Sequence, residues 1–133
     1  MQESDLEAQG VQHISRKEYS EAIDCFDRAA SQSDSAHLEA RYLRFAARTF
    51  HMMGRNERSD EYFARAIAKD TTPYSHLDYC KHLHALGRLQ ESWYHHDQSR
   101  SMAQLNKRMS HRSGYIMTEL DEIQRSLPPR TES

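Results

Sequence analysis

Apolar residues recur along most of this chain at the three- and four-residue spacing of an amphipathic helix, with short polar breaks between segments. One such segment, residues 19–31, has five apolar side chains on one face: Ala22, Ile23, Phe26, Ala29 and Ala30. Gly54 and Gly87 follow two other segments, as glycines do where helices stop. The pattern predicts helices over about residues 3–14, 19–31, 36–53, 57–69, 73–86, 89–100 and 102–126.

The composition agrees with an all-α class. The chain has 13 Ala and 10 Leu but only 1 Val, 5 Ile and 5 Thr, so residues that favour strands are scarce. Leu, Ile, Val and Phe make up only 20 of 133 residues, which suggests disorder, but the formal net charge of -2 argues against it. We expect a single domain over residues 1–127 and a disordered tail over residues 128–133.

The helical pattern also repeats along the chain. Gly54 and Gly87 are 33 residues apart, and this offset superposes residues of similar size: Phe50 on Leu83, Ala47 on Cys80, and Ser59 on Ser92. A step of 37 residues towards the N-terminus superposes a second set: Phe63 on Phe26, Ala66 on Ala29, Ser59 on Ala22, and Ala47 on Gly10. Three helix-turn-helix units therefore recur, over about residues 3–35, 36–71 and 73–100.

This pattern resembles the tetratricopeptide repeat (TPR) family, whose unit is an antiparallel helix pair of about 34 residues. The matching residues of the first unit are Leu6, Gly10, Tyr19, Ala22, Phe26 and Ala29. Those of the second are Leu43, Ala47, Phe50, Gly54, Ser59, Phe63 and Ala66, and those of the third are Cys80, Leu83, Gly87, Leu89 and Ser92. The third unit departs from the pattern at His76, His96 and Ser99, and the usual proline between units is replaced by Asp34 and Thr71.

The resemblance implies a right-handed superhelix in which the first helix of each unit lines a concave groove. Charge singles out the middle of the chain, because residues 1–37 carry 8 acidic and 3 basic residues whereas residues 38–69 carry 4 and 7. Arg41, Arg44, Arg48 and His51 fall within an arc of roughly 80° on one helix. Clustered cations favour an anionic partner, since their mutual repulsion is relieved when an anion binds between them.

We therefore predict that the groove binds an acidic, or phosphorylated, peptide segment. The candidate binding residues are Arg41, Arg44, Phe45, Arg48, His51, Met52, Lys81 and His84. The alternative is that the arginines form a solvated face, or one neutralised by the acidic first helix. A heat-shock chaperone tail is a poor candidate ligand, because the five positions of the family's carboxylate clamp carry Glu7, Val11, Phe45, Tyr74 and Asp78.

The last predicted helix, over about residues 102–127, carries a nearly heptad series of apolar residues: Met102, Leu105, Met109, Ile116, Leu120, Ile123 and Leu127. Such a helix can cap the exposed end of the third repeat. The alternative is that it forms a homodimer, or links the repeats to a signalling partner, which would make the protein a regulatory or assembly subunit.

Other classes of function find less support. His76, Cys80 and His84 are spaced four residues apart and could converge on a metal ion, but the repeat pattern explains Cys80 as a close-packing small residue. The chain has no motif typical of an enzyme, and its pI of about 6.5 does not favour nucleic-acid binding. No segment is apolar enough to insert into a membrane. We expect a cytoplasmic, non-enzymatic protein-protein interaction module, such as an adaptor, chaperone or scaffold, without a cofactor.

Overall fold

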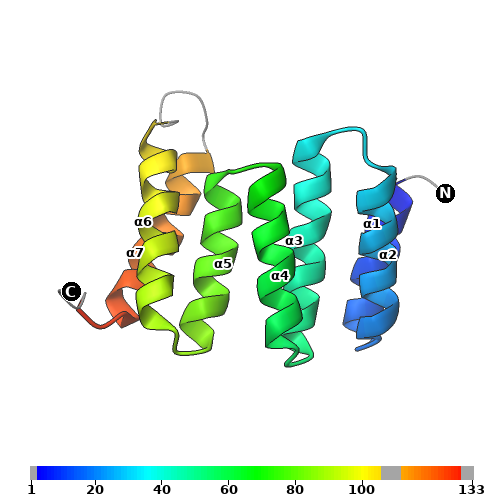
Figure 1. Ribbon diagram of the computed structural model, residues 1–133, viewed down its shortest axis with the longest axis horizontal. Helices are drawn as coiled ribbons and strands as arrows, with labels where there is room; N and C mark the ends of the chain where they lie inside the picture. Colours follow the sequence, from blue (N-terminus) through cyan, green and yellow to red (C-terminus); the bar gives the residue numbers. More distant parts are fainter. Residues whose placement is uncertain (1–2, 106–111, 130–133) are drawn as a thin grey trace. The chain divides into compact units, whose positions relative to one another are not determined.

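All regular secondary structure in the described residues of the computed structural model, 3–105 and 112–129, is α-helical (Figure 1). The helices are α1 (Glu3–Ser15), α2 (Tyr19–Gln32), α3 (Ala36–Met52), α4 (Asn56–Lys69), α5 (Pro73–Ala85), α6 (Leu89–Leu105) and α7 (Arg112–Ser126). The predicted all-α class is confirmed. No helix within these residues is both long and apolar enough to cross a membrane.

The chain divides into two compact units, and we describe each by itself. Unit 1 covers residues 1–71 and contains α1 to α4, and unit 2 covers residues 72–133 and contains α5 to α7. In unit 1 each helix packs against the next one along the chain, whereas in unit 2 α7 packs against both α5 and α6. The single domain and the three-repeat superhelix therefore remain predictions.

The three helical hairpins, α1–α2, α3–α4 and α5–α6, close with the same backbone turn. In each turn an amide donates to a carbonyl five residues earlier: Glu18 to His13 (2.8 Å), Arg55 to Phe50 (2.9 Å) and Arg88 to Leu83 (2.9 Å). The residue before each donor has a positive φ: +60° at Lys17, +74° at Gly54 and +75° at Gly87. This left-handed residue ends a helix and starts the connection to its partner. Lys17 adopts it although it is not a glycine.

Equivalent positions of the hairpins are also packed alike. In two hairpins a buried serine of the second helix donates to a carbonyl of the first, from Ser59 to Ala47 (2.8 Å) and from Ser92 to Cys80 (3.1 Å). The repeat offsets also superpose Phe26, Phe63 and His96, which lie on the second helices of the three hairpins. Each of these residues is only 1% exposed. The departures from the family pattern thus still occupy buried positions.

Gly10 allows α1 and α2 of the first hairpin to approach closely. A Cβ atom added at Gly10 would lie 2.6 Å from Cε1 and 2.7 Å from Cζ of Phe26. Carbon atoms in contact are normally about 3.5–4.0 Å apart, so the ring occupies the space that a side chain at residue 10 would need. Gly10 is required here because of packing.

A difference in helix length explains why the two repeat spacings differ. Helix α3 has 17 residues and α5 has 13, whereas α2 and α4 each have 14. Compared with α5, α3 therefore has four additional residues before the turn of its hairpin, and they lengthen α3 at its N-terminal end. That end contacts the end of α4 through two pairs, His37 Nδ1 with Asp70 Oδ2 (2.9 Å) and Lys69 Nζ with Glu39 Oε2 (3.1 Å).

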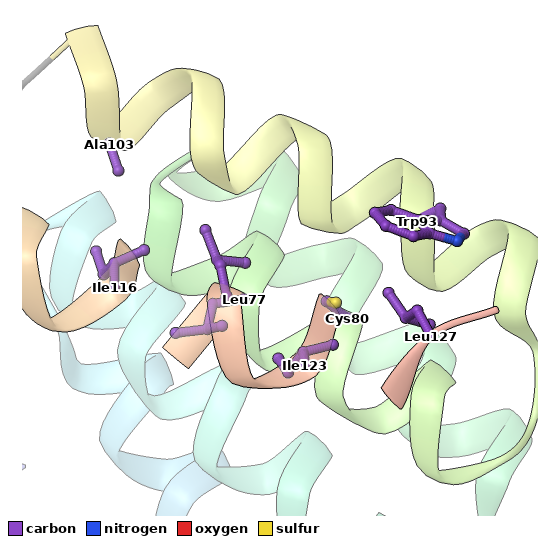
Figure 2. Packing of buried hydrophobic residues seen from close by; sticks show 8 residues of the cluster. Leu77, Cys80, Trp93, Ala103, Ile116, Ile123 and Leu127 are labelled. Carbon is purple, nitrogen blue, oxygen red and sulfur yellow. The ribbon is translucent and has the colours of Figure 1, made fainter. Parts of the chain in front are cut away.

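Unit 2 has its own apolar core, to which all three of its helices contribute. Figure 2 shows its side chains gathered from α5, α6 and α7. The buried members are Leu77, Cys80, Trp93, Ala103, Ile116, Leu120, Ile123 and Leu127. The second half of the predicted apolar seam, Ile116, Leu120, Ile123 and Leu127, thus packs α7 and the residue after it against α5 and α6.

The predicted boundary between the last two helices is wrong. Helix α6 does not stop at Arg100 but continues to Leu105, so Met102 and Leu105 belong to α6 and not to the last helix. Ser99 and Ser101 are polar but do not break a helix, and Ala103 is buried in the core, which holds the additional turn in place. The predicted seam residue Met109 lies outside the described residues.

Pro128, the first residue of the predicted disordered tail, is held by a hydrogen bond. Trp93 Nε1 donates to the backbone carbonyl of Pro128 (2.8 Å), so this residue is attached to α6 although the composition suggested a disordered tail from residue 128. The remaining tail residues, 130–133, lie outside the described part of the chain.

Candidate binding surface

The predicted basic stripe lies on α3, and the structure explains its orientation. Ser35 caps the helix by accepting from the amide of Leu38 (3.3 Å). The opposite side of α3 is buried in unit 1 through Ala40, Tyr42, Leu43, Ala46, Ala47, Thr49 and Phe50. Arg48 is exposed, and Arg41, Arg44 and His51 are half-buried. The division of α3 into a core face and a basic face is as predicted.

Arg41 is bound by the first helix. Its Nε donates to Oε1 of Glu7 on α1 at 2.8 Å, and both side chains remain partly exposed, at 43% and 28%. Partly exposed ion pairs are worth about 0–1 kcal/mol, because solvent screens them. The alternative that the acidic first helix neutralises the basic stripe therefore applies to Arg41. The ion pair is also weak enough for another carboxylate to replace Glu7.

Phe45 forms an aromatic platform between two of the arginines. The guanidinium carbons of Arg41 and Arg48 lie 4.9 Å and 5.8 Å from the centre of its ring. On another side, the ring contacts Phe26 of α2, with 5.4 Å between ring centroids. Cation–π contacts of this kind hold guanidinium groups in place without consuming their N–H donors. The arginine donors are thus partly ordered before a ligand binds.

Helices α1 and α3 each carry an exposed apolar side chain. Met52 follows it at the C-terminal end of α3 and is 46% exposed, and Val11 of α1 is 54% exposed. A surface that combines exposed apolar atoms with forked N–H donors suits a peptide that carries both apolar and acidic side chains. Sequence reasoning named Met52 for this role but used Val11 only to exclude the carboxylate clamp.

Lys81 and His84, the two remaining predicted binding residues, lie in unit 2 and contact α7. Lys81 Nζ is 3.3 Å from Oε2 of Glu119, and His84 Nε2 is 3.1 Å from Oγ of Ser126. A hydrogen bond from Tyr115, together with Lys81, lowers the pKa of Glu119 and keeps its carboxylate charged. Within unit 2 these two residues therefore help to hold the last helix, a role that the sequence did not predict.

The three residues suggested as metal ligands are directed towards different partners. His76 Nδ1 lies 2.8 Å from His95 Nδ1, whereas His84 contacts Ser126. Cys80 Sγ lies 3.3 Å from Ser92 Oγ in the core, and burial raises the pKa of the thiol, which disfavours the thiolate that a metal needs. In the described ranges, no group of three or more His, Cys, Asp or Glu side chains could hold a metal ion.

Glu7 is the contact residue that sequence reasoning did not assign to the surface. One signal for it was present, because Glu7 and Arg41 are 34 residues apart, which is about one repeat. Residues at that offset lie on the first helices of successive hairpins, so a carboxylate and a guanidinium there can meet.

Comparisons with family models, curated proteins and solved structures gave no match to this chain.

Proposed function

We propose that this chain is a TPR-like, non-enzymatic protein-interaction module that binds an acidic peptide segment on the α1–α3 face of unit 1. The observation that carries the proposal is the contact between Arg41 and Glu7. It places a carboxylate against the basic stripe at 2.8 Å, which is the geometry that an acidic side chain of a partner would use. A partner would replace Glu7 and extend along the stripe to Arg44 and Arg48.

The aromatic platform supports this proposal. Phe45 holds the guanidinium groups of Arg41 and Arg48 over one ring, so their loss of side-chain entropy on binding is smaller than for mobile arginines. An arginine fork binds a carboxylate or a phosphate through two parallel hydrogen bonds. An acidic peptide and its phosphorylated form would therefore both be recognised, in the soluble, cytoplasmic setting that the sequence suggests.

The burial of α7 does not favour the alternative of dimerisation through the last helix. Three seam residues of α7, Ile116, Leu120 and Ile123, are buried within unit 2. They would have to leave that core before they could contact a second chain.

The test compares two double charge reversals by fluorescence anisotropy with a labelled oligoglutamate peptide. Arg44→Glu/Arg48→Glu should weaken binding at least about tenfold, because each charge-assisted hydrogen bond contributes about 1.5–3 kcal/mol. The matched control, Arg16→Glu/Arg28→Glu, makes the same change of net charge at exposed positions outside α3 and should leave the affinity within about twofold. If both variants lose affinity equally, the effect comes from the net charge of the protein and the proposed surface is wrong. Unchanged binding by Arg44→Glu/Arg48→Glu would also refute the proposal.

A pull-down from cell extract with wild type and the Arg44→Glu/Arg48→Glu variant would then identify the partner. Proteins retained only by the wild type are the candidates, and their acidic segments can be synthesised and measured in the anisotropy assay. Far-UV circular dichroism of both variants shows whether their helices are intact. A variant that unfolds gives no information on binding, and single reversals would then replace it.

A further inference from the structure

Two imidazole rings join the helices of the α5–α6 hairpin. Nδ1 of His76 on α5 lies 2.8 Å from Nδ1 of His95 on α6, and the ring centroids are 5.0 Å apart. His76 is only 5% exposed and His95 is half-buried. At this distance one Nδ1–H must donate to the bare Nδ1 of the other ring, so the contact requires at least one neutral imidazole.

Two tyrosine rings lie against His95 of this pair. The rings of Tyr79 and Tyr94 lie 4.5 Å and 4.9 Å from that of His95, and His82 contacts Tyr79 at 6.1 Å. The acidic group that acts on His95 is Glu91, one turn earlier on α6, and Arg88 binds both of its carboxylate oxygens, at 2.7 Å and 3.0 Å. Two acidic residues of α7 contact other cations: Glu119 contacts Lys81 and Asp121 contacts Arg100.

Three other histidines show what this pair lacks. A carboxylate oxygen lies near Nδ1 of His13 (Glu18, 3.1 Å), of His37 (Asp70, 2.9 Å) and of His96 (Asp97, 3.2 Å). In the part of the chain that the structure describes, neither His76 nor His95 has a carboxylate within hydrogen-bond distance. A positive charge on the pair would therefore lack a carboxylate in direct contact, and a second charge would also break the contact between the rings.

We propose that His76 and His95 form a proton-sensitive latch, which holds α5 and α6 together while the pair is neutral and weakens unit 2 when acidification charges it. Burial lowers the pKa of His76, and burial together with the proximity of His76 lowers the pKa of His95 to about 4. Both shifts favour the neutral form in the folded state. The stabilisation is thus complete above the ordinary value of 6.5 and is lost as the pH falls towards 4.

Trp93 provides a specific readout because it is the only tryptophan in the chain and lies in α6 of unit 2. Urea unfolding of the full chain, followed by its fluorescence, should give a folding equilibrium constant about 25-fold smaller at about pH 5 than at about pH 7.5, from His95 alone. In His76→Asn/His95→Asn the amides occupy the positions of the Nδ1 atoms and do not titrate, so the loss should shrink to a few-fold. The control His37→Gln removes an exposed histidine of unit 1 and should keep the full wild-type loss.

A wild-type loss of only a few-fold, or an Asn/Asn variant with the full loss, would overturn the proposal. If that variant does not fold, nuclear magnetic resonance of histidine-labelled wild type decides the question. The ring of His95 should be neutral at about pH 6, and one of the two Nδ1 atoms should be protonated and the other bare. A charged ring at His95 at this pH would refute the latch.

Discussion

Substitution of Gly10 by alanine tests the close packing of the first hairpin. In an exposed helix interior, replacing glycine by alanine stabilises by about 1 kcal/mol, because alanine is the better helix former. At Gly10 the new Cβ would lie 2.6 Å from Cε1 and 2.7 Å from Cζ of Phe26, which is about 1 Å too close. Overpacking of a core costs about 1–3 kcal/mol, so we expect Gly10→Ala to reduce the free energy of unfolding by about 1 kcal/mol.

The sign of this change distinguishes packing from helix propensity. Urea unfolding of the full chain should be followed by far-UV circular dichroism, because Trp93 reports on the other unit. In a Phe26→Leu background the obstructing ring atoms are absent, and Gly10→Ala should become neutral or stabilising by up to about 1 kcal/mol. The control Gly54→Ala should destabilise in both backgrounds, since Gly54 has a φ of +74° and no atom within 4 Å of an added Cβ. A stabilising effect of Gly10→Ala in the wild-type background would refute the reasoning.

Two further predictions concern the turn at Lys17 and the core of unit 2. Lys17→Gly should raise the free energy of unfolding by about 0.5–1 kcal/mol, because glycine adopts the positive φ of +60° without strain. An unchanged or lower melting temperature, measured by circular dichroism, would contradict this prediction. Leu120→Ala removes a fully buried side chain of α7 and should cost about 2–5 kcal/mol in urea unfolding followed by Trp93 fluorescence. A loss below about 1 kcal/mol would mean that α7 does not stabilise unit 2.

The sequence was sufficient for those helix ends that depend on a single residue. Gly54 and Gly87 marked two turns, and α5 begins at residue 73 as predicted, where Thr72 Oγ1 accepts from the amide of Ser75 (3.2 Å). The first turn carried no such signal, because Lys17 adopts the same backbone conformation at an energetic cost. Helix α6 was predicted too short because polar residues are ambiguous: they are found both in loops and on helices.

The candidate binding surface was predictable only within one helix. Helical periodicity placed Arg41, Arg44 and Arg48 on one face, and α3 has them there. Contacts between helices depend on crossing geometry, which periodicity does not contain. For this reason the pairing of Arg41 with Glu7 remained one alternative among several, and the contact of Lys81 with α7 was not predicted. The imidazole pair was missed because its members are 19 residues apart and belong to different helices.

The additional length of α3 shows which changes of length this architecture accepts. Four residues advance a helix by about 400°, only about 40° more than a full rotation, so the phase of the buried face is almost preserved. A single inserted residue would rotate everything on one side of it by about 100° and turn core side chains towards water. Helices in hairpins of this kind can therefore lengthen or shorten by about one helical turn at a time. The 37- and 33-residue spacings of this chain differ by one such turn.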